Sequence, residues 1–224
     1  MTDFIRPILI LAWKDVLLEL RTKDVVVSVL MFALLAAIIF NFAFVPSPAV
    51  LALVVPGILW VAFTFAGVLG FNRSFMLEKD KGSLEGLLLC PVSRDVIYFG
   101  KLLGLVAFML VAEAVLFPLF GILYNFSLFD PWLFLVAALA TIGFAGVGTL
   151  FSAIAVNTRS REIMLPVLLL PVAAPVVIAA VEATRVILGG ASFGEAARWW
   201  QLLLAFDVIF LVVSSFVFGA VLEE

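Results

Sequence analysis

Residues 72–101 read NRSFMLEKDKGSLEGLLLCPVSRDVIYFGK and form the longest polar interruption of a chain that is otherwise mostly apolar. The 224-residue chain is 66% hydrophobic and only 13% charged, whereas soluble domains carry about 25% charged residues. Its mean hydropathy is +1.30. The residues on either side of this stretch therefore cross a membrane or flank one, and we interpret the chain as a polytopic membrane protein.

Six apolar runs are long enough to cross a bilayer, since a helix needs about 20 apolar residues to span a hydrocarbon core roughly 30 Å thick. They predict an all-α fold with six transmembrane helices at residues 25–45, 49–71, 102–124, 132–156, 163–188 and 202–222. Too little remains outside these runs for a soluble domain, so residues 1–224 are interpreted as a single transmembrane domain.

Small residues recur every four positions in two of these runs, and such stripes let neighbouring helices approach closely. The stripes are Ala62, Ala66 and Gly70, and Thr141, Ala145, Thr149 and Ala153. We interpret both as packing surfaces within one subunit.

Residues 1–24 are predicted to form an amphipathic helix that lies on the cytoplasmic membrane surface. Apolar side chains repeat at helical spacing, and charged side chains supply a polar side. The apolar set is Trp13, Val16, Leu17 and Leu20, and the charged set is Lys14, Asp15, Glu19, Arg21 and Lys23. A cytosolic extension of the first spanning helix is the alternative at this point.

The placement of lysine and arginine predicts the orientation. Of the 13 such residues, all but Arg185 and Arg198 fall on one side of the predicted topology. Because cytoplasmic segments carry the excess of Lys and Arg, we place both termini and residues 72–101 in the cytoplasm.

Missing residue types exclude several kinds of chemistry. Histidine is absent and Cys90 is the only cysteine, which removes His-assisted nucleophiles, His or Cys metal clusters and intrachain disulfides from this chain. The chain also lacks a G-x-x-x-x-G-K-[ST] phosphate loop, so it carries no ATP-binding loop of that type.

The outer side is expected to carry a kinked helix followed by a short re-entrant segment. Prolines remove backbone donors and crowd the preceding turn, and the fifth run contains Pro166, Pro171 and Pro175. Ser192 and Glu195 then have capping-box spacing, so residues 192–201 are predicted to form a short interfacial or re-entrant helix.

The pattern within residues 72–101 predicts a short amphipathic helix. A charged run at residues 78–81 precedes Gly82, a break, and Ser83, a candidate N-cap. Leucines follow at i, i+3 and i+4, and Pro91 ends the helix. By periodicity alone, two interpretations carry equal weight: the leucines lie in the lipid interface, or another protein grips the helix in the cytoplasm.

The whole arrangement resembles the ABC-2 type (type V exporter) permeases, and three motifs resemble the CcmB family in particular. The motifs are Trp13-Lys14-Asp15 with Glu19-Leu20-Arg21-Thr22-Lys23, Phe71-Asn72-Arg73-Ser74-Phe75 with Glu78, and Gly82-Ser83-Leu84-Glu85-Gly86-Leu87-Leu88-Leu89 before Pro91. The resemblance covers the full length, although the motifs lie in the first 101 residues. It implies the membrane subunit of a cytochrome c maturation, or haem exporter, ABC transporter in the bacterial inner membrane.

The resemblance also implies that residues 84–89 form a coupling helix that docks on a separate ATPase subunit similar to CcmA. The residues that it assigns to this coupling are Glu78, Gly82, Ser83, Leu84, Glu85, Gly86, Leu87, Leu88, Leu89 and Pro91. Two copies of the chain are expected. The other implied partners are a haem-handling membrane subunit similar to CcmC, a small single-span subunit similar to CcmD and a periplasmic haem chaperone similar to CcmE. No nucleic acid is expected.

Because the chain has no phosphate loop, the resemblance implies that it is a non-catalytic subunit and that the partner subunit binds and hydrolyses ATP. In this interpretation the complex handles haem, and this chain binds no cofactor directly. Without histidine, and with Cys90 predicted on the cytoplasmic side, the chain lacks the usual axial haem ligands along an outward path. Our hypothesis is that it transmits ATP-driven motion to a complex in which another subunit ligates the haem.

Four charged residues are predicted inside the membrane. Glu113 lies about halfway along the third run, where an ionised side chain costs roughly 2.5–3.5 kcal/mol, so it must be neutral, paired or facing a polar cavity. Glu182, Arg185 and Asp207 lie at similar depth near the outer ends of the last two runs. They are candidates for an ion network, which we interpret as a structural clamp.

Other function classes fit less well. The nearest alternative is an ABC-2 permease that exports another substrate, such as a lipid, a glycan or a drug. A secondary transporter would predict an inverted internal repeat, and no convincing repeat is found. An intramembrane aspartyl protease would need two Asp inside the bilayer, whereas only Asp207 is predicted there.

Overall fold

The computed structural model describes residues 2–22, 24–43, 48–80, 82–124, 130–156, 158, 160–190 and 194–221, and within them the regular structure is entirely helical. The helices are α1 (Thr2–Thr22), α2 (Asp24–Ala43), α3 (Pro48–Asp80), α4 (Ser83–Leu88), α5 (Arg94–Tyr124), α6 (Pro131–Val156), α7 (Arg161–Leu188) and α8 (Ala197–Val221). The all-α prediction is therefore confirmed for the described part of the chain.

Within the described part of the chain, five helices are long and apolar enough to cross a membrane. Their apolar segments are Leu53–Asn72 in α3, Arg94–Tyr124, Pro131–Val156, Glu162–Leu188 and Ala197–Val221. In α2 the apolar segment that the structure describes, Val27–Phe40, is shorter than the roughly 20 residues of a full span. Five of the six predicted spans are thus supported by length and composition, and the first stays a prediction.

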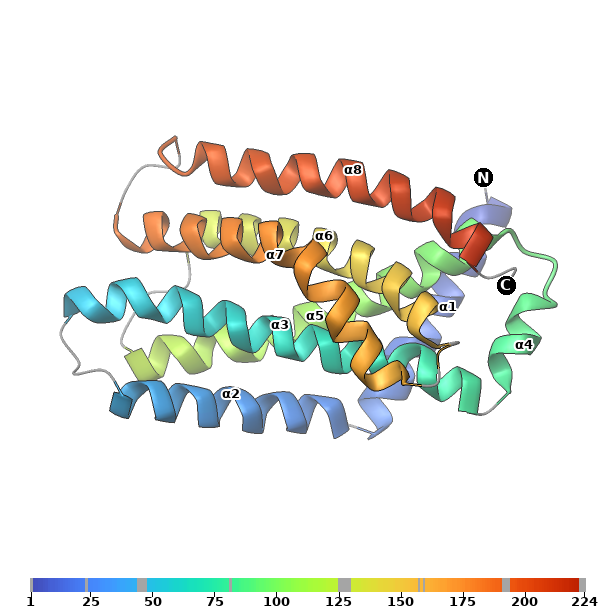
Figure 1. The fold of residues 1–224 in the computed structure, drawn as a ribbon, viewed down its shortest axis with the longest axis horizontal. Coiled ribbons are helices and arrows are strands. Elements are labelled where there is room, and N and C mark those ends of the chain that lie inside the picture. Colours follow the sequence, from blue (N-terminus) through green and yellow to red (C-terminus); the bar gives the residue numbers. More distant parts are fainter. Residues whose placement is uncertain are drawn as a thin grey trace.

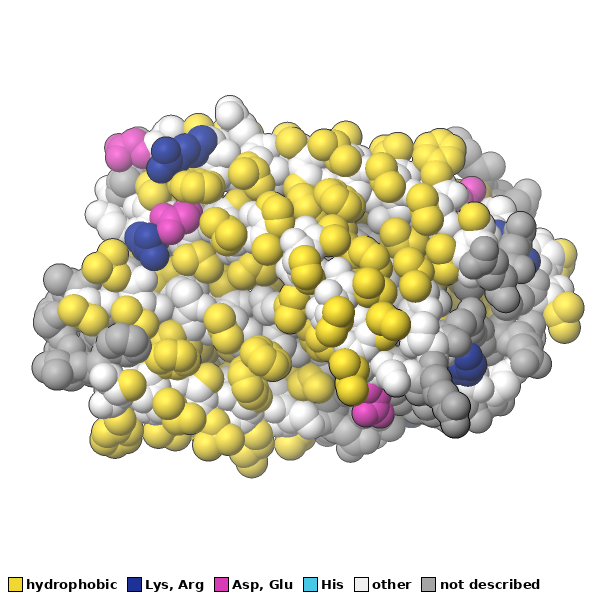
Figure 2. Space-filling view, viewed as in Figure 1, with side chains coloured by type: hydrophobic (Ala, Val, Ile, Leu, Met, Phe, Trp, Pro, Cys, Tyr) yellow, Lys and Arg dark blue, Asp and Glu magenta, His cyan; other side chains and the backbone are white. Residues whose placement is uncertain are grey.

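The long helices run side by side, and α1 crosses one end of the bundle (Figure 1). The start of α1, α4 and the end of α8 lie at this same end, on the right of the view. Hydrophobic side chains cover the middle of the visible face, whereas charged side chains gather toward its two ends (Figure 2). This distribution suits a bundle whose middle faces hydrocarbon and whose ends face water.

Both small-residue stripes are buried. Ala62 and Ala66 are at most 1% exposed, and Thr141, Ala145, Thr149 and Ala153 are 0% exposed. A Cβ added at Gly70 would lie 2.5 Å from the ring of Phe108 on α5. The prediction that these stripes serve packing within the subunit is confirmed.

The polar stretch 72–101 is mostly helix, which corrects the prediction of a long loop. α3 continues to Asp80, and α5 already begins at Arg94. The physical reason is that charged residues do not break a helix. α3 therefore continues beyond its apolar segment, α5 begins before the predicted span at 102–124, and Gly82 and Pro91 interrupt the helix between them. Gly82 has a φ of +66°, a left-handed conformation that glycine adopts without strain.

The segment predicted to form a kinked helix and a re-entrant helix also differs from its prediction. α7 is one continuous helix that changes direction along its length (Figure 1), and Pro166, Pro171 and Pro175 all lie inside it. Residues 194–196 form a turn, and α8 then begins at Ala197. Among the described residues there is no separate re-entrant helix at 192–201, because the apolar helix extends back through Trp199. The Ser192 cap lies outside the described residues.

α1 is a separate helix that runs in a different direction from α2 (Figure 1), so it is not an extension of the first apolar run. Its outer face is apolar: Leu9, Ile10 and Trp13 are 56%, 59% and 61% exposed. This face fits the predicted surface helix. The predicted polar side is wrong at Lys14 and Asp15, which make ion pairs with residues of the bundle.

Candidate functional site

α4 is a short helix of 6 residues that lies between two helix breakers, Gly82 and Pro91. The backbone N–H of Gly82 donates to the carbonyl oxygen of Lys79 at 3.0 Å, and the Ser83 hydroxyl donates to the carbonyl oxygen of Glu78 at 3.1 Å. The predicted short helix therefore exists, and hydrogen bonds tie its first residue to the last turn of α3.

The residues of the predicted coupling segment do not all face the same way. Leu87 is half-buried and packs against the hydrophobic core. Gly86 and Pro91 are exposed, and Leu89 is 86% exposed. The side chains of Leu84, Glu85 and Leu88 lie outside the described set. α4 thus anchors on the bundle through Leu87 and leaves apolar surface free at its C-terminal end.

Four charged side chains from three helices meet beside the base of α4. The Lys101 ammonium of α5 lies 2.8 Å from Glu78 Oε2 of α3 and 3.0 Å from Asp15 Oδ2 of α1. The Lys14 ammonium bonds to Glu78 Oε1 and lies 3.3 Å from Asp15 Oδ1. Two cations and two carboxylates therefore close into a ring of balanced charge. We call Lys14, Asp15, Glu78 and Lys101 the charge ring.

Most of the charge ring is removed from solvent. The side chains of Lys101, Glu78 and Asp15 are 0%, 5% and 14% exposed, whereas that of Lys14 is 40% exposed. Lys101 also lies over the ring of Phe75, 5.2 Å from its centroid, which adds a cation–π contact. Buried charges are tolerated when they are paired, and here each charged group has two opposite neighbours.

The pKa values in the ring agree with this pairing. Burial opposes the ionisation of Glu78, but the ammonium groups of Lys101 and Lys14 outweigh it and lower the pKa of the carboxyl below its ordinary 4.5. Burial likewise opposes the charge on Lys14, yet Asp15 and Glu78 raise the pKa of its ammonium above 10.5. Both directions favour the charged forms of Glu78 and Lys14 at neutral pH.

Two glycines of α5 bring α1 close enough to form the ring. A Cβ at Gly100 would lie 2.7 Å from the Cβ of Leu11, and a Cβ at Gly104 would lie 3.0 Å from the Cβ of Asp15. Gly100 and Gly104 stand four residues apart and present one small surface to α1. The pair therefore sets the distance at which Asp15 reaches Lys101.

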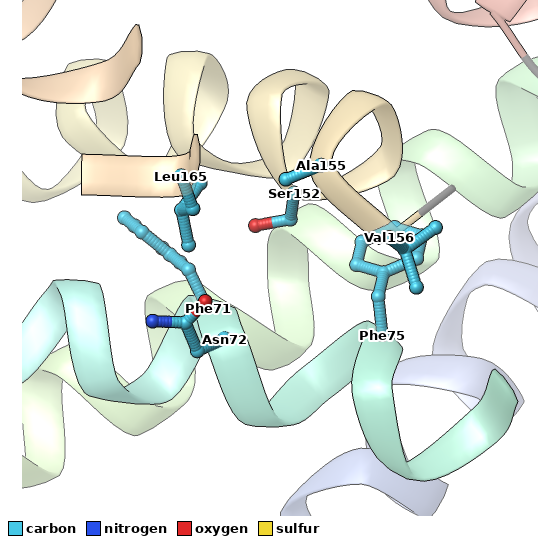
Figure 3. Close-up of a pocket in the computed structure, with 7 residues that line it drawn as sticks. All are labelled: Phe71, Asn72, Phe75, Ser152, Ala155, Val156 and Leu165. Carbon is cyan, nitrogen blue, oxygen red and sulfur yellow. The ribbon is translucent and has the colours of Figure 1, made fainter. Parts of the chain in front are cut away.

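The end of α3 is also tied to α6. Lys79 donates from its ammonium to the carbonyl oxygen of Val156, the last residue of α6, at 2.7 Å. Beside this contact, seven side chains from α3, α6 and α7 surround a small hollow (Figure 3). Its volume of about 10 Å³ is near the minimum for one water molecule. We interpret it as a helix contact and not as a substrate site.

An open apolar groove lies between α3 and α7 in the membrane-facing part of the bundle. Its volume is about 230 Å³, which is below the roughly 300–1,000 Å³ of typical ligand pockets. Its lining residues are Val61, Thr64, Phe65, Leu170, Ala174, Val177 and Ile178. The groove offers contact area but few polar groups to orient a ligand.

Glu113 accepts a hydrogen bond from a residue that the sequence pattern did not identify as its partner. The Thr141 hydroxyl of α6 donates to Glu113 Oε1 at 2.6 Å, and the Glu113 side chain is buried. A hydrogen bond of this kind satisfies a carboxyl group inside the bundle. The structure thus gives Glu113 a role in packing α5 against α6.

The candidate ion network of Glu182, Arg185 and Asp207 is only partly formed. Arg185 donates to Glu182 Oε1 at 2.7 Å within α7. Asp207 does not join them: it is 4% exposed, and neither carboxylate oxygen has a hydrogen-bond partner among the described residues. It faces Gly143, where an added Cβ would lie 2.2 Å from Asp207 Oδ1. A similar depth in the bundle does not bring Asp207 to Arg185, because α8 directs Asp207 toward α6.

Sequence reasoning found Glu78 but missed the ring that it belongs to. Lys14 and Asp15 were assigned to a solvated helix side, and Lys101 was placed at the boundary of the polar stretch. One signal was available: all four lie near the predicted cytoplasmic boundary, in three segments that must converge there. Which of these charges meet depends on how each helix is rotated about its own axis, and this rotation is set by tertiary packing.

Comparisons with known proteins agree on one family. The family model described as CcmB protein matches residues 6–224. Heme exporter protein B of Bradyrhizobium diazoefficiens is 29% identical over 216 residues, covering 94% of this chain and 95% of that protein. The proteins of the same name from Paracoccus denitrificans and Pseudomonas aeruginosa are 28% and 27% identical over 195 and 216 residues. They cover 87% and 96% of this chain, and 88% and 95% of their own lengths.

Proposed function

The chain belongs to the CcmB family, and on that premise we propose that it is the membrane subunit of an ABC transporter that serves cytochrome c maturation. Its relatives carry the name heme exporter protein B, which supports haem as the substrate of the complex. The five long apolar helices support a multi-pass membrane protein. We place it in the bacterial inner membrane with both termini in the cytoplasm.

In this proposal α4 is the coupling helix that docks on a separate ATPase subunit. The observation that carries it is that α4 lies at the same end of the bundle as the start of α1 and the end of α8 (Figure 1), with Leu89 86% exposed. A partner that covers this surface would remove apolar area from water. Leu87 points toward the core instead, so we assign it to anchoring α4.

The division of labour follows from the residues of this chain. It contains no phosphate loop of the G-x-x-x-x-G-K-[ST] type, so the ATPase subunit binds and hydrolyses ATP. We propose two copies of the chain with two ATPase subunits. We further propose a haem-handling membrane subunit, a small single-span subunit and a periplasmic haem chaperone as partners, with the chain delivering the ATP-driven motion that supports haem export or release of the loaded chaperone.

Co-purification of the chain with the candidate ATPase and haem-handling subunits tests this proposal. Leu89→Asp and Glu85→Arg change the segment proposed to dock, while Leu87 is left in place because its loss would disturb the core. Glu162→Arg is the matched control, since Glu162 is exposed in the first turn of α7. We expect both α4 variants to capture at least about tenfold less ATPase, equivalent to about 1.4 kcal/mol of binding free energy. Wild-type capture by both variants would refute docking at α4.

A further inference from the structure

We propose that the charge ring is the joint through which movement of α4 reaches α1 and α5, with Glu78 as its positioning residue. This inference rests on the proposed function, because it takes α4 as the element that an ATPase moves. It goes beyond that function by naming the side chains that carry the motion into the bundle and by giving α1 a part in coupling.

The first step is the link between α4 and Glu78. α3 ends at Asp80 and α4 begins at Ser83, so only two residues separate the helices. The Ser83 hydroxyl donates to the carbonyl oxygen of Glu78 at 3.1 Å, and the N–H of Gly82 donates to the carbonyl oxygen of Lys79 at 3.0 Å. A displacement of α4 therefore acts on the last turn of α3, where Glu78 lies.

The second step is the link from Glu78 to two other helices. One carboxylate oxygen bonds to Lys14 of α1, and the other lies 2.8 Å from Lys101 of α5. Lys101 and Lys14 both also pair with Asp15 of α1, at 3.0 Å and 3.3 Å. Because the ring is closed, a shift of Glu78 strains contacts with α1 and with α5 together.

The third step is the burial of the ring. Coulomb attraction is stronger away from water and is screened less by salt, and Lys101 and Glu78 are 0% and 5% exposed. Gly100 and Gly104 allow α1 to pack closely against α5. The Lys101–Glu78 pair therefore cannot readily exchange its partners for water, so it transmits a displacement that an exposed ion pair would absorb by rearranging.

Charge balance makes the proposal testable separately from folding. Glu78→Gln leaves the ring with one extra positive charge, and Lys101→Met leaves it with one extra negative charge. A buried unpaired charge is strongly destabilising, so either single variant lowers the Tm. The double variant Glu78→Gln/Lys101→Met is neutral again and retains the Lys14–Asp15 pair, but α3 no longer holds α1 or α5 by charge.

The experiment uses the full chain in complex with the ATPase and haem-handling subunits. Three quantities are measured: the Tm of the chain, the amount of ATPase captured, and cytochrome c matured per ATP hydrolysed. For the double variant we expect most of the lost Tm to return, with wild-type ATPase capture and at least a tenfold loss of maturation per ATP. The control is Glu182→Gln/Arg185→Met, which removes an i,i+3 pair distant from α4 in sequence, and it should change none of the three.

A merely structural ring predicts a different result. If the double variant regains its Tm and matures cytochrome c at the wild-type ratio, the joint is refuted while docking at α4 stands. If wild-type chain captures no ATPase, the proposed function fails and the inference falls with it. Glu78→Asp covers the case of a misfolded double variant, because it keeps the charge and shortens the reach. For Glu78→Asp we expect a near-normal Tm and at least a threefold lower amount of cytochrome c matured per ATP hydrolysed. If this amount is unchanged, the proposal is overturned.

Discussion

The ammonium nitrogen of Lys101 lies 2.8 Å from Oε2 of Glu78, and the lysine side chain is fully buried. The two residues belong to α5 and α3, on either side of α4. Buried charges are tolerated when they are paired, and Glu78 is one of the two carboxylates that pair with this lysine. The stability of the end of the bundle that holds α4 should therefore depend on the ionisation of Glu78.

Acid should weaken the bundle through Glu78. The pKa of its carboxyl is lowered from 4.5 when the chain is folded, because Lys101 and Lys14 outweigh the opposing effect of burial. A lowered pKa contributes stability that is fully present above the unfolded value and is lost as pH falls through the folded value. We expect the Tm of the wild type in detergent to fall as pH drops below 4.5, with a smaller fall in Glu78→Gln.

Comparing the wild type with Glu78→Gln separates the effect of ionising Glu78 from the effects of the other acidic residues. At pH 7 the variant should be less stable than the wild type, because Lys101 loses one of its two carboxylates. The gap in Tm should narrow as the pH decreases. A gap that stays constant from pH 7 to below 4.5 would contradict the assigned role of Glu78 ionisation.

A single methyl group at Gly100 should loosen α1. The added Cβ would lie 2.7 Å from the Cβ of Leu11, and a Cβ is too close to its own backbone to rotate away. Overpacking of this kind costs about 1–3 kcal/mol. We expect Gly100→Ala to lower the Tm and to make α1 more susceptible to limited proteolysis, because the charge ring must stretch when α1 moves outward.

The same substitution at Gly57 provides the control. No heavy atom lies within 4 Å of a Cβ at that position of α3, and alanine is favoured over glycine inside a helix by up to about 1 kcal/mol. Gly57→Ala should therefore leave the Tm unchanged or raise it. Equal losses in both variants would mean that close packing of α1 is not the cause.

The hydrogen bond between Thr141 and Glu113 should be worth more than an ordinary threonine contact. Thr141→Val keeps the side-chain shape but removes the 2.6 Å donor to Glu113 Oε1, leaving a buried polar atom without that partner. Such a loss costs about 1–3 kcal/mol. The measurement is thermal unfolding of the purified chain in detergent.

Thr149→Val is matched to this change, since Thr149 is also 0% exposed on α6. Its hydroxyl donates to the carbonyl oxygen of Ala145 in its own helix, so its loss leaves no orphaned carboxyl. We expect a clearly smaller decrease in Tm. Similar decreases for the two valine variants would show that Glu113 finds another donor.

Much of the architecture could be predicted because it depends on local chemistry. Apolar runs of sufficient length give five of the predicted spans, and Gly82 and Pro91 bracket the short helix in the polar stretch. The ends of helices were predicted less well: α3 runs to Asp80 and α5 starts at Arg94. The apolar pattern reports where hydrocarbon ends, whereas a helix continues until a residue breaks it.

For the candidate site, too, the sequence identified important residues but not all of their partners. The sequence identified Glu78 and the short helix, and it identified Glu113, Glu182, Arg185 and Asp207 as charges that need an explanation. It did not predict that Thr141 would pair with Glu113, nor that Asp207 would stand apart from Arg185. Each of these outcomes depends on the rotation of one helix against another, which small residues such as Gly143 permit without specifying the partner.

The sequence by itself determined that this chain is a helical membrane protein with a short amphipathic helix in its polar stretch, because length, hydropathy and helix breakers act locally. Only the tertiary structure decided that Lys14, Asp15, Glu78 and Lys101 form one buried ring. Residues 14 and 101 are far apart in the chain, and close packing of α1 on Gly100 and Gly104 brings them together. Attraction between charges depends on distance in space and on burial, and both are set by how the helices pack.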